Sequence, residues 1–153
     1  MTFDEVFELF KDNKNIAKKL KLMIAVGLGY LVLRQPSVSL SGGEVQRLKM
    51  VKELAKTKRI NSLYILDEPS IGLHMEDISN LVLILQQLVG KKNTVLIVEH
   101  ETYILAQCDW LIELGPVGGP DGGFIVGEGT PEAIANLETP TAPYLKEILE
   151  VKN

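Results

Sequence analysis

Apolar positions recur at helical spacing through the first part of the chain. Phe3, Val6, Phe7 and Phe10 predict a helix over Thr2–Phe10, with Thr2 and Glu5 as a capping box at its start. A second apolar stripe begins at Ile16 and stops at Gly27, which is a plausible end for a helix. We interpret both stripes as packing surfaces, because a helical apolar stripe usually faces a core.

The next part of the chain alternates between short apolar runs and helical patterns. Ser62–Leu66, Thr94–Val98 and Trp110–Leu114 read as strands, and a helical pattern over Ile78–Leu88 separates the first two. Strand, helix, strand, helix and strand in this order predict an α/β fold with a mostly parallel sheet flanked by helices. Gly115–Gly123 is rich in Gly and Pro and predicts a loop leading to an extended run at Phe124–Val126.

The end of the chain predicts two further helices. Thr130 can cap a short one with Pro131 at its first position, and a final helix is expected over Pro143–Val151. We expect one domain, with a helical region over residues 1–57 and an α/β lobe over 58–153.

The stretch Leu40–Glu44, with the sequence LSGGE, directly precedes a helical pattern over Val45–Lys56. Ser41 and Glu44 have the spacing of a capping box. Two glycines in the first helical turn are unusual because glycine weakens the helix that it begins. They leave backbone N–H groups open at the positive end of the helix dipole, which favours an anion such as phosphate.

The helix expected over Val45–Lys56 should bury one apolar face. That face is made of Val45, Leu48, Val51, Leu54 and Ala55. The polar residues are expected on the other faces; these are Glu44, Gln46, Arg47, Lys49 and Lys52. A polar turn is expected over Lys56–Asn61.

Composition is that of a globular protein, with 46% hydrophobic residues and a formal net charge of −4. The charge gives no sign of a nucleic-acid surface, which usually shows a basic excess.

Cys108 is the single cysteine, so neither an internal disulfide nor a cysteine zinc cluster is expected within this chain. The apolar run Leu22–Leu33 is shorter than the about 20 residues that span a bilayer. We expect a soluble, cytoplasmic protein with no membrane partner.

Acidic residues and a histidine follow two of the predicted strands. Asp67 and Glu68 come directly after the first strand, and His100 follows the second. If these strands are parallel, all three residues face one edge of the sheet, where ligands of α/β folds gather. Phosphoryl transfer needs a metal site, a positioned water and hydrogen-bond donors that stabilise the charge developing on the phosphate. These residue types can supply that combination.

The motifs LSGGE, YILDEPSIGLH and IVEH together resemble those of the ABC-type ATPases. Within that superfamily the chain is similar to the UvrA family of bacterial nucleotide excision repair, over nearly its whole length. The specific features are VGLGYLVLRQPSVSLSGGEVQRLK, the histidine at position 74, and LIELGPVGGPDGGFIVGEGTPE. The similarity is to the C-terminal end of the second ATPase module.

The resemblance implies a role for each motif. Asp67 corresponds to the magnesium-site aspartate, Glu68 to the catalytic glutamate and His100 to the switch histidine. Leu40, Ser41, Gly42, Gly43 and Glu44 would contact the terminal phosphate of an ATP held by a different ATPase module. Ser70-Ile71 and Glu101-Thr102-Tyr103 differ from the residues that the family usually has at these positions. A divergent paralogue is therefore an alternative.

No phosphate-binding G-x-x-x-x-G-K-[ST] motif occurs in the chain. The chain alone is therefore expected to be inactive, and ATP and Mg²⁺ are expected as cofactors only of a larger parent ATPase. The implied partners are the remainder of a UvrA-like chain with its Walker A motif, a dimer partner, UvrB and damaged DNA. Zinc is expected only outside this chain.

Two alternatives stay open at this point. The C-terminal half of an SMC-like ATPase head also carries a signature, an acidic pair and a histidine, but it needs a long heptad helix upstream. A non-catalytic ABC-fold interaction module would explain the missing phosphate loop.

Overall fold

The computed structural model describes residues 1–55, 61–119 and 122–151. The chain forms two compact units, Met1–Val98 and Glu99–Asn153, and each is described by itself. The expected division after residue 57 and most of the expected turn over Lys56–Asn61 lie in residues 56–60, outside the described residues.

The first unit begins with two packed helices, α1 (Phe3–Phe10) and α2 (Lys14–Ala25). Thr2 and Glu5 form the expected capping box at the start of α1. Gly27 ends the second helical region with a φ of +71°, and a Cβ there would come within 2.7 Å of Leu73 Cδ2. Glycine is therefore required at this turn for both its conformation and its lack of a side chain.

Helix α3 (Gly42–Leu54) follows a short 3₁₀ turn, η1 (Ser37–Ser39), and starts with the expected capping box. Its buried face differs from the one expected, since the fully covered residues are Glu44, Arg47, Met50 and Val51. Val45, Leu48 and Leu54 are only half-buried. Glu44 and Arg47 can be buried because each has a hydrogen-bond partner: Glu44 accepts from the Tyr30 hydroxyl, and Arg47 donates to the Ile71 carbonyl.

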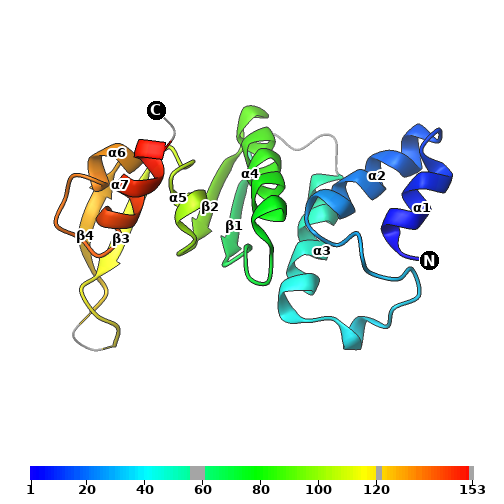
Figure 1. Cartoon of the computed structure of the whole chain (residues 1–153), viewed down its shortest axis with the longest axis horizontal. Coiled ribbons are helices and arrows are strands. Elements are labelled where there is room, and N and C mark those ends of the chain that lie inside the picture. Colours follow the sequence, from blue (N-terminus) through cyan, green and yellow to red (C-terminus); the bar gives the residue numbers. More distant parts are fainter. Residues whose placement is uncertain (56–60, 120–121, 152–153) are drawn as a thin grey trace. The chain divides into compact units, whose positions relative to one another are not determined.

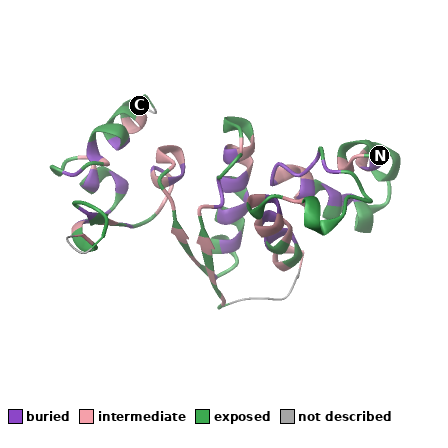
Figure 2. Ribbon diagram, turned by 90° about the horizontal axis from the view of Figure 1, so that it is seen from below, coloured by how far each residue is buried: buried purple, intermediate pink, exposed green. Residues whose placement is uncertain are grey.

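The α/β part of the first unit is a strand–helix–strand unit, drawn in green in Figure 1. Strands β1 (Leu63–Asp67) and β2 (Thr94–Val98) pair in parallel, with Leu63 opposite Thr94 and Asp67 opposite Val98. Helix α4 (Met75–Gly90) connects them and packs against β2. Its buried stripe, purple in Figure 2, is made of Ile78, Leu81, Val82, Ile84, Leu85 and Leu88.

The second unit holds a β-hairpin with three helices. Strands β3 (Leu111–Gly115) and β4 (Phe124–Gly129) pair antiparallel. Its helices are α5 (Thr102–Leu105), α6 (Pro131–Ile134) and α7 (Ala142–Val151). A small core joins them, formed by Ala106, Leu111, Ile134 and Leu145.

The α/β class is confirmed, but the parallel sheet is narrower than expected. Among the described residues β3 pairs with β4 in a separate two-stranded sheet and does not extend the β1–β2 pair. Strand β3 instead pairs antiparallel with β4, its neighbour in sequence. The expected cap at Thr130 and the helix near the C-terminus are both present. In the part of the chain that is described, no helix is long and apolar enough to cross a membrane.

Candidate functional site

The acidic pair lies at the carboxyl edge of the parallel strands. Asp67 is the last residue of β1 and stands opposite Val98, the last residue of β2. The backbone N–H of Glu68 donates to the Val98 carbonyl at 2.8 Å, which holds the start of the loop against β2. The expectation that the two strands are parallel and end at one edge is therefore confirmed.

His100 follows β2 by two residues and belongs to the second unit. Its backbone N–H and that of Glu101 donate to the Glu99 carboxylate at 3.0 and 3.1 Å. This arrangement fixes the local path of the chain after β2. That the His100 side chain shares an edge with the acidic pair stays a prediction.

The backbone of Glu68 is in the left-handed region, with a φ of +43°. This conformation is unusual for a residue with a side chain and costs on the order of 1 kcal/mol. A tight turn follows, in which Ile71 N–H donates to the Glu68 carbonyl at 3.2 Å and Leu73 N–H to the Ser70 carbonyl at 3.0 Å. The surrounding loop thus maintains a strained backbone at the residue proposed from sequence as catalytic.

The start of α3 is open, as the glycine pair predicts. Ser41 and Gly42 are exposed, and a Cβ on Gly42 would meet nothing within 4 Å. The Ser41 N–H donates to the Glu44 carboxylate at 2.6 Å, and the Glu44 N–H donates to the Ser41 hydroxyl at 3.3 Å. The capping box occupies the Glu44 N–H and fixes the helix start, but it does not use the N–H groups of Gly42 and Gly43.

Tyr30 is a part of this site that sequence reasoning missed. Its hydroxyl donates to the Glu44 carboxylate from 14 residues upstream. The hydrogen bond from Tyr30, reinforced by those from Ser41, lowers the pKa of Glu44 from its usual 4.5. The same contact raises the pKa of Tyr30 above its usual 10.0. An isolated tyrosine in a Gly-rich stretch gave no sequence signal for this contact.

Two side chains of α3 connect the helix to the loop after β1. Gln46 Nε2 donates to the Asp67 carbonyl, and Arg47 Nη1 donates to the Ile71 carbonyl at 2.8 Å. Arg47 is only 3% exposed, and its Nε has no hydrogen-bond partner among the described residues. The signature helix and the Asp67–Ile71 loop are therefore joined by side chain to backbone hydrogen bonds. The sequence pattern predicts both residues outside the apolar face, and for Arg47 an exposed position is wrong, because its side chain is buried.

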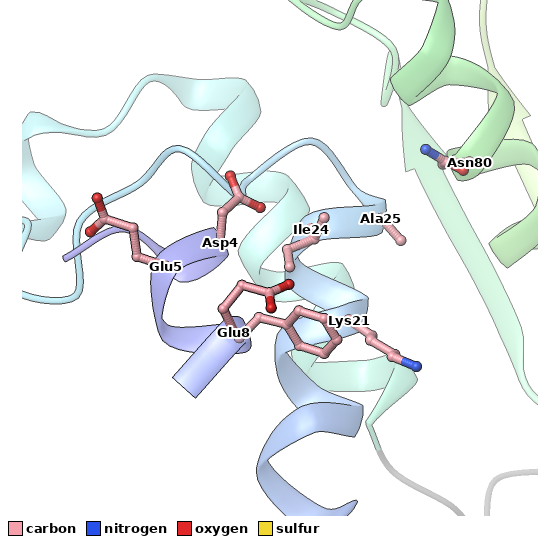
Figure 3. A pocket seen from close by; sticks show the side chains of 8 residues that line it. Asp4, Glu5, Glu8, Lys21, Ile24, Ala25 and Asn80 are labelled. Atoms are coloured by element: carbon pink, nitrogen blue, oxygen red, sulfur yellow. The ribbon is translucent and has the colours of Figure 1, made fainter. Parts of the chain in front are cut away.

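Two hollows can be described in the first unit. One of 610 Å³ is lined by Asp4, Glu5 and Glu8 of α1 and by Lys21 and Ile24 of α2 (Figure 3). Lys21 Nζ stands 5.6 Å from the centre of the Phe7 ring. The other, of 230 Å³, lies between α3 and β1. Neither contains a candidate catalytic residue.

Comparison with known proteins shows which proteins the chain is similar to. No protein-family model matches the chain. It is 48% identical over 151 residues to UvrABC system protein A of Thermus thermophilus, and 46% identical over 151 residues to the same protein of Aquifex aeolicus. The structure of UvrA2 from Deinococcus radiodurans superposes with a TM-score of 0.84 and 43% identity, covering 96% of this chain and 18% of that one.

The chain matches a C-terminal segment of UvrA. It corresponds to the C-terminal part of its relatives, and it spans about 16% of the length of the curated relatives it matches. The likeness to UvrA2 supports a mixed α/β fold like that of the matching segment of that structure. That α1 to α3 form a helical signature region of an ABC-ATPase domain stays a prediction.

The Tyr30–Glu44 hydrogen bond predicts a pH-dependent loss of stability. We expect Tyr30→Phe to lower the free energy of unfolding by about 1 kcal/mol at pH 7, a modest value because Tyr30 is exposed to solvent. The folded-state pKa of Glu44 is lowered, so its contribution is present above pH 4.5 and is lost as the pH falls through the folded-state pKa. The loss caused by Tyr30→Phe should therefore shrink in acid.

The measurement is urea unfolding of both proteins between pH 3 and 8. Tyr144→Phe, at a similarly exposed tyrosine, is the matched control and should have no such pH profile. A loss that is constant down to pH 3 would contradict the assigned contact.

The two glycines of α3 predict opposite effects. Gly42→Ala should stabilise the chain by about 0.5 kcal/mol, since alanine favours the helix and the site is open. A Cβ on Gly43 would stand 3.2 Å from Arg47 Nη1 and 3.3 Å from the Ile71 carbonyl oxygen. Gly43→Ala should therefore disturb that hydrogen bond and destabilise by about 1 kcal/mol. Equal thermal midpoints for the two variants would refute this difference.

Proposed function

We propose that this chain is the C-terminal part of an ATPase domain in a UvrA-like protein of nucleotide excision repair. The observation that carries the proposal is a single arrangement in the first unit. An open, glycine-bearing helix start is joined by hydrogen bonds to a loop that places Asp67 and Glu68 at the carboxyl edge of parallel strands. This arrangement suits nucleotide hydrolysis.

The signature segment Leu40–Glu44 would receive the terminal phosphate of ATP held by a different ATPase module. The N–H groups of Gly42 and Gly43 in the first turn of α3 and the positive end of its dipole favour that anion. Gly42 has open space on its Cα, so a phosphate can approach the backbone closely. Glu44 would act by holding the helix start, because its carboxylate is already engaged by Ser41 and Tyr30.

Asp67 would help to hold Mg²⁺ through its water shell. The described residues contain no group of three or more His, Cys, Asp or Glu side chains that could enclose a metal. A single exposed carboxylate at a strand end fits Mg²⁺, which keeps several waters and binds few protein carboxylates beside the nucleotide phosphates. The bound ion would neutralise charge on those phosphates.

Glu68 would orient the attacking water and accept its proton as the water oxygen bonds to the terminal phosphorus, while the bond from that phosphorus to the bridging oxygen breaks and ADP leaves. Its left-handed backbone conformation turns the chain sharply after β1, whereas Asp67 is still part of the strand. His100 would act as the switch histidine and contact the terminal phosphate. In this assignment Glu68 moves the proton and His100 positions the phosphate.

The parent protein would supply what this chain lacks. We propose that its Walker A phosphate loop and first ATPase module come from the remainder of a UvrA-like chain, and that it works with a dimer partner, UvrB and damaged DNA. Its cofactors would be ATP and Mg²⁺, with zinc bound outside this segment.

A non-catalytic docking module is the second candidate. It is favoured by one observation, the absence of a phosphate-loop motif from the chain. The two candidates differ in whether Asp67 and Glu68 take part in ATP hydrolysis.

The test is a hybrid in which this chain replaces the matching C-terminal segment of the Thermus thermophilus relative, to which it is 48% identical. The other module's catalytic glutamate is replaced beforehand, so that only the site containing Glu68 can act. We expect Mg²⁺-dependent ATP hydrolysis, and we expect Glu68→Gln to slow it about 100-fold while nucleotide binding is retained.

Glu101→Gln is the control, since it removes the charge of a carboxylate that has no role in the proposed chemistry. The isolated chain should show no hydrolysis above background. A hybrid that hydrolyses ATP equally well with Glu68→Gln would refute the catalytic assignment, and an inactive hybrid that still binds its partners would favour the docking module.

A further inference from the structure

Tyr30 lies on the connection between α2 and α3, in a short stretch whose backbone is fixed on both sides of it. Leu28 is fully buried and Leu31 is 3% exposed, so these neighbours anchor the stretch in the core of the first unit. The carbonyls of Gly29 and Leu31 accept hydrogen bonds from N–H groups at the start of α1, at 3.1 and 3.0 Å. The backbone of Tyr30 is therefore held in place, while its side chain stays outside the core.

The side chain of Tyr30 makes its main contact through its hydroxyl. The residue is 57% exposed, so burial of its ring contributes little. The hydroxyl donates to Oε1 of Glu44, a residue of α3 that is only 9% exposed. The Arg47 guanidinium is close as well, and its charge offsets part of the rise in the pKa of Tyr30 that the hydrogen bond to Glu44 causes. The polar end of Tyr30 is thus bound at the start of α3.

Both carboxylate oxygens of Glu44 have protein donors. Oε1 accepts from Tyr30, and Oε2 accepts from the Ser41 N–H at 2.6 Å. Ser41 is the N-cap of α3, and the next two residues are Gly42 and Gly43, whose N–H groups would receive the terminal phosphate. Glu44 therefore links the position of Tyr30 to the backbone that carries the phosphate donors.

A helix start that contains two glycines needs a constraint from outside. Glycine has more backbone freedom than any other residue, and a Cβ on Gly42 would meet nothing within 4 Å, so no neighbouring group confines it. Hydrogen-bond donors stabilise developing charge best when they are held in place before the reaction. A carboxylate free to turn toward the phosphate would also repel it. The hydrogen bond from Tyr30 counters both effects, because it fixes one oxygen of Glu44 and leaves the other for the Ser41 N–H.

We propose that Tyr30 is a positioning residue for the terminal phosphate of ATP: its hydroxyl holds the Glu44 carboxylate, which in turn holds the Ser41 N–H and the glycine N–H groups that follow. This inference rests on the proposed function, in which Leu40–Glu44 contacts an ATP held by another module. It adds to that site a residue from outside the signature segment. Tyr30 acts through Glu44 and does not itself contact the reacting atoms.

The test uses the hybrid with the Thermus thermophilus relative, carrying Glu68→Gln and keeping the other module's catalytic glutamate. Only the site that Leu40–Glu44 would complete can then hydrolyse ATP. We expect Tyr30→Phe to lower kcat about tenfold and to change KM less than about twofold. The reason is that the other module holds most of the nucleotide, whereas the donors of α3 act on charge that develops in the transition state.

Asn13→Ala is the matched control for a general loss of stability. The Asn13 side chain accepts from the Ile16 N–H at 3.3 Å and caps α2, so its removal destabilises the same helical region to a degree similar to Tyr30→Phe. It leaves the bond between Tyr30 and Glu44 in place, so kcat should stay within about twofold of the unchanged hybrid. An equal loss of kcat in both variants would assign the effect to destabilisation and overturn the proposal.

A double variant tests whether Tyr30 acts through Glu44. Once Glu44→Ala has removed the acceptor, adding Tyr30→Phe should lower kcat by less than about twofold further. A full further loss would overturn the proposal, as would a Tyr30→Phe effect confined to KM or no effect at all. If Glu44→Ala prevents folding, the comparison of Tyr30→Phe with Asn13→Ala still decides. A folded hybrid with intact Tyr30 that does not hydrolyse ATP would refute the proposed function, and the inference with it.

Discussion

The first unit depends on the way α3 holds the loop after β1. A loop that follows a strand and contains a left-handed glutamate does not keep one conformation by itself. Here two neighbouring side chains of α3, Gln46 and Arg47, donate to its backbone carbonyls at Asp67 and Ile71. Because Arg47 is buried, water competes poorly for that carbonyl, and the hydrogen bond constrains the loop more than an exposed one would.

This connection joins two sites that the proposed function assigns to different nucleotides. The start of α3 would contact an ATP bound by another module, while Asp67 and Glu68 would serve the ATP of their own module. A shift of α3 on phosphate binding would be transmitted through Arg47 to the Ile71 carbonyl, and so to the turn that holds Glu68. The contact network supplies a physical route for such coupling.

Sequence patterns predicted the elements that depend on local chemistry. The capping boxes at Thr2 and Ser41, strand β2 and the open helix start were all readable, because their causes lie within a few residues. The burial of Arg47 and the contact of Tyr30 were missed, because the partner of Arg47 lies 24 residues away in sequence and the partner of Tyr30 lies 14 residues away. The pairing of β3 with β4 was also missed: apolar strand patterns do not state which edge a strand joins. The roles of Asp67, Glu68 and His100 rest on family likeness and remain predictions.

Amide hydrogen exchange of the isolated chain with Arg47→Met tests the role of α3 most directly. Methionine keeps much of the volume of arginine but cannot donate to the Ile71 carbonyl. We expect amide exchange at least about tenfold faster at Ile71 and Leu73, with exchange in the buried stripe of α4 unchanged. Unchanged exchange in this loop, or an equal acceleration throughout residues 1–98, would contradict it.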